Sequence, residues 1–184
     1  MLPVIIIIVV VVLLVLIGIV VYNGLVRLRN RVDEAWAQID VQLKRRHDLI
    51  PNLIETVKGY ASHERQTLEE VVQARNQAVN ASSPQQAGQA ENVLTQTLGR
   101  LFALAEQYPD LKANQNFLEL QEELTSTEDK VAYSRQFYND SVRSFNTKIQ
   151  SIPAKFFAGP MGYSARQYFE TETAADREVP KVQF

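Results

Sequence analysis

Hydrophobic positions along the chain form an unbroken apolar run, then long stretches with helical spacing, and finally an aromatic-rich end. The first run extends from Leu2 to Val21 without a charged residue. About 20 apolar residues at a rise of about 1.5 Å each span the hydrocarbon core of a bilayer, which is ~30 Å thick. The run therefore predicts a transmembrane helix. No basic residue precedes it, which argues against a cleaved signal peptide.

Beyond this run, apolar residues recur at steps of three and four, which predicts one long helix that continues from the membrane span. Gly59 and a capping Ser62 predict a break before a second helix. The first stripe comprises Val32, Trp36, Ile39, Leu43, Ile50, Leu53, Val57 and Tyr60, and the second comprises Leu68, Val71, Val72 and Ala78.

Capping signals predict where two further helices begin. Ser83, Pro84 and Gln86 match a capping box with proline at the first helical position, and we expect this helix to end at Tyr108 before Pro109. A similar pattern at Asn116 and Glu119 predicts a helix that starts at Phe117. Its apolar stripe runs through Val131, Tyr138, Val142, Phe145, Ile149 and Ile152, until Pro153 stops it.

The predicted fold class is all-α, because no segment alternates with a period of two for long enough to indicate a sheet. We expect an N-terminal transmembrane helix followed by an antiparallel up-and-down bundle of about four long helices. The predicted domains are the anchor at 1–22, the bundle at 23–152, and an irregular aromatic-rich tail at 153–184.

The stretch from Gln42 to Glu55 carries basic residues and a proline within this helical pattern. Trp36 begins one of the two apolar rows, and Arg46 is the one residue that breaks their register. Full burial of an unpaired guanidinium costs several kcal/mol, so Arg46 either pairs with a carboxylate, such as Glu128 or Asp129, or extends to water. We favour the second. Lys44 and Arg45 lie off the apolar rows and predict a solvated face.

Pro51 raises a separate question about the same helix. Proline removes a backbone donor and disfavours helical geometry at the residue before it, which predicts a kink. The apolar phase continues across Pro51 and favours a bend. Alternatively, Asp48 caps a new helix that starts near Pro51.

Residues with catalytic or metal-binding potential lack the spacing that such chemistry needs. Neither His47 nor His63 has a second ligand three or four positions away, and E-x-x-H and H-E-x-x-H do not occur. We interpret His47 as a surface or packing histidine. No glycine-rich phosphate loop or G-x-S-x-G motif occurs either. We therefore predict no enzyme and no cofactor.

Charge and cysteine content narrow the function further. Lys and Arg number 19 against 21 Asp and Glu, a net charge of −2, so no basic surface indicates nucleic-acid binding. With no cysteine, the chain has no disulfide, thiol chemistry or thiolate metal site.

Residues after the apolar run indicate its orientation and its interface with lipid. Tyr22 is an interfacial aromatic, and Arg27, Arg29 and Arg31 follow on the carboxyl-terminal side. By the positive-inside bias, the N-terminus lies outside and the bundle in the cytoplasm.

The C-terminal tail is too rich in aromatic residues for a disordered segment. It contains Phe156, Phe157, Tyr163, Tyr168, Phe169 and Phe184. Either these residues pack back on the bundle, which we favour, or they dock on a neighbouring subunit or partner.

Several separated segments, in this order, resemble the LemA family of bacterial membrane proteins. They are the run YNGLVRLRNRVDEAWAQIDVQLKRRHDLIPNLIETVKGYASHE, the pair Ala74 and Arg75, the stretch QFYNDSVRSFNTKIQSIPAKFFA, and the YFE at Tyr168 to Glu170. The resemblance implies a single N-terminal anchor, a helical bundle and a bacterial source. We therefore expect the anchor to cross the bacterial inner membrane once. The family has no established catalytic activity, so no catalytic residues carry over.

Two functional hypotheses follow. In the first, the protein is a membrane-anchored scaffold that self-associates into a homo-oligomer. In the second, it is an adaptor or regulator that binds another membrane protein, such as a protease or a signalling component.

Overall fold

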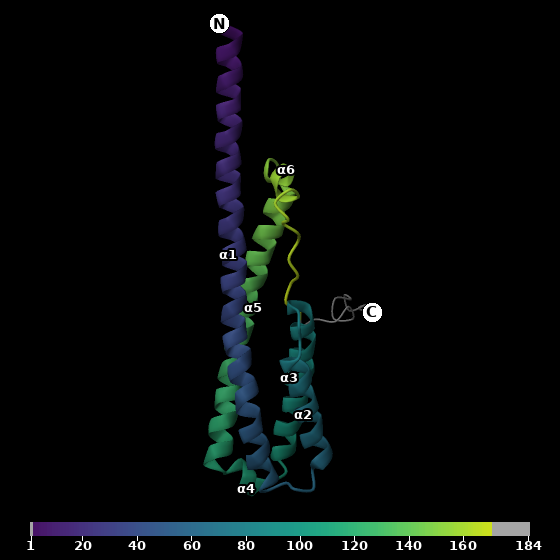
Figure 1. Ribbon diagram of the computed structural model, residues 1–184. Helices are drawn as coiled ribbons and strands as arrows, with labels where there is room; N and C mark the ends of the chain where they lie inside the picture. The colour runs from purple at the N-terminus through teal and green to yellow at the C-terminus, as the bar shows by residue number, and fades with distance from the viewer. Residues whose placement is uncertain (1, 171–184) are drawn as a thin grey trace, which may run out of the picture. The chain divides into compact units, whose positions relative to one another are not determined.

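Helices account for the regular structure of residues 2–170, which are the residues that the computed structural model describes. Their bounds are α1 (Leu2–Lys58), α2 (Arg65–Val79), α3 (Pro84–Ala105), α4 (Pro109–Lys112), α5 (Gln115–Gln150) and α6 (Ala154–Ala158). Figure 1 shows this order. The all-α class is confirmed, whereas the up-and-down arrangement and the three domain boundaries stay predictions.

Helix α1 confirms that the apolar run continues without a break into the amphipathic stretch. Its apolar part is long and hydrophobic enough to cross a membrane. Pro51 lies inside this helix, so the alternative of a new helix capped by Asp48 is wrong. The break predicted near Gly59 is confirmed, but Glu64, not Ser62, holds the N-cap position of α2.

The predicted start of α3 is confirmed. Ser83 is the N-cap, Pro84 is the first helical residue, and the Ser83 hydroxyl accepts a hydrogen bond from the backbone N–H of Gln86 at 3.3 Å. The Gln86 side chain accepts from the N–H of Ser82 instead of from Ser83. The helix ends at Ala105, three residues before the predicted Tyr108.

The predicted cap of α5 is wrong by two residues. Asn114, not Asn116, precedes the helix, and its side-chain oxygen accepts from the N–H of Phe117 at 3.0 Å. The short helix α4 brings the chain to this point and was not predicted, because four residues carry no periodic signal.

Contacts group the chain into two compact units. Unit 1 comprises residues 1–37 and 137–166, and unit 2 comprises residues 38–136 and 167–184. Helices α1 and α5 therefore each contribute one part to each unit.

In unit 1, the two long helices run antiparallel. Leu25 of α1 shares a buried cluster with Ala154, Arg31 lies over the ring of Phe137, and Trp36 contacts Tyr138. Residue numbers therefore increase along α1 in the direction in which they decrease along the segment that faces it.

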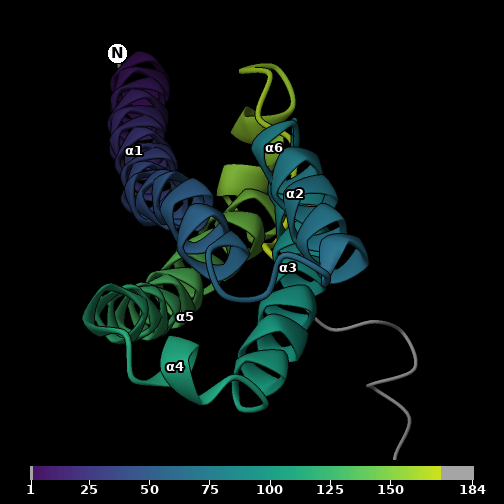
Figure 2. The ribbon, with the colours of Figure 1, turned by 90° about the horizontal axis from the view of Figure 1, so that it is seen from below.

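In unit 2, α2 and α3 lie side by side (Figures 1 and 2), and one apolar core joins them to the second part of α1 and the first part of α5. Loop contacts support the end of this core: Tyr108 donates a hydrogen bond to Glu64, and Asn114 donates to the hydroxyl of Tyr60. The core comprises Ile50, Leu53, Ile54, Val57, Ala61, Leu68, Val71, Ala74, Ala78, Leu94, Leu98, Leu101, Ala105, Leu111, Phe117 and Leu124.

Candidate functional site

The most concentrated polar chemistry in unit 2 is a buried cluster formed by Arg46, His47 and Glu91. Arg46 Nη1 donates to Glu91 Oε2 at 3.0 Å, and His47 Nε2 lies 2.5 Å from Glu91 Oε1. All three residues are buried. Both oxygens of the carboxylate are therefore engaged, and one residue of α3 links two consecutive residues of α1.

Further polar groups complete the surroundings of Arg46 and His47. Arg46 Nη2 donates to Thr95 Oγ1 at 2.8 Å and lies 3.6 Å from a carboxylate oxygen of Glu128. Arg75 Nε donates to the backbone carbonyl of His47 at 2.7 Å. The cluster thus draws together side chains from α1, α2, α3 and α5.

This arrangement corrects our expectation for Arg46, whose head does not extend to water. Its partner is Glu91, which we did not predict, while Glu128 contributes only a longer contact at the rim. A signal for Glu91 did exist, because this carboxylate interrupts the apolar stripe of α3 between Ala87 and Leu94. A lone acid on one apolar face and a lone base on another indicate a buried pair.

The chemistry of the cluster is structural cross-linking. A buried guanidinium with a carboxylate partner penalises any helix register that separates the two charges. His47 is a packing histidine, as predicted, but its ring is bound to Glu91 and not merely surrounded by apolar groups. Among the described residues, no group of three acidic, histidine or cysteine side chains is arranged to hold a metal ion.

A cavity of about 180 Å³ lies beside this cluster, lined by Arg46, Glu128 and Phe169 among others. Phe169 is buried, and the next residue, Glu170, lies directly against Gly88 of α3. A methyl group at Gly88 would overlap the Glu170 carbonyl group. The absence of a side chain at Gly88 therefore lets residues 167–170 lie close to α3.

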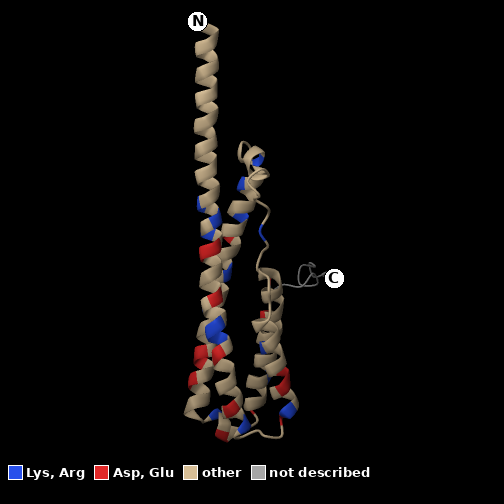
Figure 3. Cartoon of the chain, viewed as in Figure 1, with Lys and Arg blue, Asp and Glu red and all other residues tan. Residues whose placement is uncertain are grey.

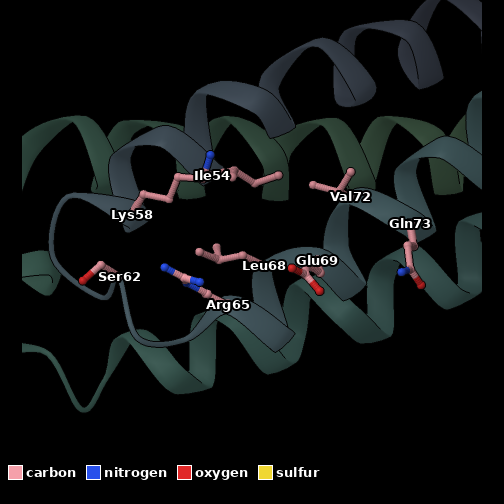
Figure 4. A pocket seen from close by; sticks show the side chains of 8 residues that line it. All are labelled: Ile54, Lys58, Ser62, Arg65, Leu68, Glu69, Val72 and Gln73. Atoms are coloured by element: carbon pink, nitrogen blue, oxygen red, sulfur yellow. The ribbon is translucent and has the colours of Figure 1, made fainter.

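A larger, open groove of about 670 Å³ lies between the end of α1 and α2. Its apolar lining consists of Ile54, Leu68 and Val72. Figure 4 shows these side chains facing the same space, with Lys58 and Arg65 at one end. An apolar floor with a charged rim is the surface that accepts an amphipathic helix or peptide.

The predicted lipid-facing residues in unit 1 follow the apolar run directly. Tyr22, Arg27, Arg29 and Arg31 are all exposed, and Figure 3 shows that charged residues begin only beyond the apolar part of α1. Arg29 also lies 3.7 Å from Asp33, and Arg31 lies over Phe137. Their contact with lipid stays a prediction.

The aromatic residues of the predicted C-terminal tail, which we expected to pack back on the bundle or to dock on a neighbour, are distributed between the two units. In unit 1, Phe157 and Tyr163 pack against the cluster that contains Leu25, while Phe156 is exposed. In unit 2, Phe169 is buried and Tyr168 is half-buried. Phe184 lies outside the described residues.

Trp36 lies in unit 1, with its ring centroid 5.4 Å from that of Tyr138. Burial raises the pKa of the Tyr138 hydroxyl, because the phenolate would lose solvation; Arg166 opposes this shift and Asp33 adds to it. Arg166 is itself paired with Asp33 at 3.1 Å. The Trp36–Tyr138 contact joins α1 to α5.

The all-α fold, the long apolar helix and the likeness to membrane-protein relatives define a membrane-associated helical protein. Comparison with protein families matches residues 35–184 to the LemA family. The chain therefore belongs to the LemA family, and the resemblance found in the sequence is confirmed.

Curated relatives include proteins with two kinds of name. Magnetosome protein MamQ 2 of Paramagnetospirillum magneticum and magnetosome protein MamQ of Magnetospirillum gryphiswaldense are each 23% identical, over 86% of this chain and 68% of the relative. Protein LemA of Metamycoplasma hominis is 29% identical, over 71% of this chain and 60% of the relative.

Proposed function

We propose that this protein is a membrane-anchored, non-enzymatic scaffold whose copies associate through α2 in unit 2. The observation that carries the proposal is an apolar strip along this helix. Leu68 and Val72 line the groove, and Val79 lies two turns beyond Val72 on the same face and is exposed. Leu68 is buried at the base of the groove, so the exposed part of the strip runs from Val72 to Val79, about 10 Å along the helix, which is about the diameter of one helix of a second copy.

Membrane anchoring supports the proposal that copies of this protein associate. Copies that share one bilayer have a high effective concentration, so an interface too weak for a soluble dimer can still assemble. The groove is lined by apolar side chains, Ile54, Leu68 and Val72, and by side chains of both charges, Lys58, Arg65 and Glu69, so the groove surfaces of two copies are compatible in chemistry. A two-fold contact places the same strip on both copies.

The polar chemistry of unit 2 also favours a scaffold over an enzyme. Glu91 is occupied by Arg46 and His47, so the buried acid and the buried histidine serve helix packing. We further propose an inner-membrane location in a bacterium, with the N-terminus outside and unit 2 in the cytoplasm, from the three arginines after the apolar run.

The test is the mass of the full-length protein by native mass spectrometry in lipid nanodiscs, in which the copies still share one bilayer. We expect a discrete oligomer for the natural sequence, a monomer for Val72→Glu, and the natural oligomer for Val93→Glu. Val93 is a matched control, because it is 43% exposed against 39% for Val72 but does not line the groove. A monomeric natural protein at cellular concentration would refute self-association.

The alternative is an adaptor or regulator that binds another membrane protein, such as a protease or a signalling component, through the same groove. Cross-linking from position 72 in native membranes separates the two. Capture of a second copy supports the scaffold, whereas stoichiometric capture of a foreign membrane protein that Val72→Glu abolishes supports the adaptor.

A further inference from the structure

The chain carries a second apolar surface in unit 1, beside the end of the transmembrane run. Ile152 is 76% exposed and Phe156 is 69% exposed, and Met161 follows at 38%. Isolated exposed apolar residues are ordinary. Here three lie within ten residues, around the short helix α6, and two of them are almost uncovered.

Contacts within unit 1 set the depth of this surface relative to α1. The Phe157 ring packs on Gly18, where a methyl group would lie 3.6 Å from it. Ala154 is fully buried in the cluster that contains Val21 and Leu25. The α6 region is therefore attached to the last turns of the apolar run and the first turn beyond it.

The length of the apolar run indicates how deep in the membrane these contacts lie. Because about 20 residues are needed to cross the hydrocarbon core, almost all of Leu2–Val21 must lie inside it. Gly18 is three residues before the end, which is about 4.5 Å along the helix. Phe157 therefore lies at the boundary between hydrocarbon and headgroups, and Phe156 and Ile152 are close to that boundary.

Charge in the same part of the chain matches an anionic surface. Residues 141–166 contain Arg143, Lys148, Lys155 and Arg166 and no acidic residue, and residues 1–32 contain three arginines and no acidic residue. Unit 1 as a whole has seven basic residues against three acidic ones, Asp33, Glu34 and Asp140, whereas the full chain has more acidic than basic residues. Figure 3 shows basic residues, and no acidic ones, at α6. Lys148 and Lys155 flank Ile152.

We propose that residues 152–161 form a second membrane contact, which inserts Ile152 and Phe156 into the headgroup boundary of the leaflet where α1 leaves the bilayer, and which prefers anionic phospholipid through Lys148 and Lys155. Exposed apolar side chains beside cations are the composition of segments that lie in this interface. The contact depends on the anchor alone, so it stands whether or not copies self-associate.

This contact assigns a role to the packing of α6 on α1. Without this contact, the part of α5 in unit 1 is held near the bilayer through its packing on α1. Insertion of the α6 region adds an attachment of α5 to the same leaflet. The antiparallel pair in unit 1 is then held to the bilayer at two points.

The experiment uses the full-length protein in vesicles at a low ratio of protein to lipid. Because the natural chain has no cysteine, Ile152→Cys and Met161→Cys each give a single site for a fluorophore. Tyr133→Cys in unit 2 is the control, since Tyr133 is also highly exposed. Quenching is measured with nitroxide-labelled lipid and with aqueous iodide, in zwitterionic vesicles and in vesicles that contain phosphatidylglycerol.

We expect labels at positions 152 and 161 to be quenched several-fold more by nitroxide lipid than the label at position 133, and several-fold less by iodide. Phe156→Asp in the Met161→Cys background should reverse this, with an unchanged helical circular dichroism signal. Lys155→Glu should weaken lipid quenching in anionic vesicles and leave it unchanged in zwitterionic ones.

Two outcomes would overturn the proposal. Ready iodide quenching at both positions in both lipids would mean that the surface faces water. Protection from iodide without lipid quenching, lost when protein is diluted in lipid, would mean that a second copy covers it.

Discussion

The buried pair Arg46–Glu91 gives the sharpest prediction for stability, and Glu91→Gln is the perturbation that tests it. The substitution preserves shape and removes the negative charge that Arg46 contacts at 3.0 Å. Breaking a buried ion pair costs about 3–5 kcal/mol. Because the amide oxygen retains one hydrogen bond, worth about 1 kcal/mol, the expected loss in the free energy of unfolding is about 2–4 kcal/mol.

The matched control is Glu70→Gln, which makes the same chemical change at the surface. Glu70 lies 3.3 Å from Arg100, and the side chain of that arginine is 63% exposed. Exposed pairs contribute about 0–1 kcal/mol. The assay is thermal unfolding of the full-length protein in detergent, followed by circular dichroism. For a unit of about 100 residues, a loss of 2 kcal/mol lowers the melting temperature by at least about 8 °C.

A double variant separates charge from packing. Arg46→Met with Glu91→Leu removes both charges and should regain most of the stability lost in Glu91→Gln, because neither apolar side chain leaves a buried charge unpaired. Equal melting temperatures for Glu91→Gln and Glu70→Gln would refute the reasoning that the buried pair joins α1 to α3.

Three further predictions concern local features; they are tested by thermal unfolding, and the one at Gly88 also by proteolysis. Asn114→Ala should cost about 1 kcal/mol because it removes the cap of α5, whereas Asn116→Ala should change little. Gly99→Ala should stabilise α3 by up to about 1 kcal/mol, since nothing lies within 4 Å of a Cβ there, whereas Gly88→Ala should displace residues 167–170 and increase proteolysis near them. Because the folded-state pKa of Tyr138 is raised, the unfolded chain loses this proton first, so stability should fall as pH rises above about 10. Tyr138→Phe should show a smaller fall.

Periodicity predicted the helices well because burial of one helix face is a local property of the sequence. The long α1 and the stripe of α5 follow from steps of three and four residues. The residues at which the helices begin and end were less predictable. Asn114 and Asn116 are both plausible caps, and the selection depends on the path of the chain through α4, where Leu111 is buried in the core.

Features that depend on packing between helices could not be predicted from the sequence. The sequence showed that Arg46 interrupts an apolar row, but its partner depends on the register of α1 against α3. The groove between α1 and α2 depends likewise on where the two helices diverge, which no local pattern records.

Predictions from the apolar periodicity failed at two residues, Arg46 and Ile152, and the two side chains have different surroundings in the structure. Arg46 was expected to reach water and is instead buried, and its charge is compensated inside the protein by Glu91. Ile152 was expected to continue the apolar stripe of α5, but the helix ends at Gln150 and leaves this side chain exposed. Some residues lie where their local preference does not fit, and nothing inside the protein compensates for this. Such residues tend to lie on functional surfaces. Because Ile152 lies close in sequence to Ala154 and Phe157, which pack against the end of the apolar run, we propose that the bilayer compensates its exposure.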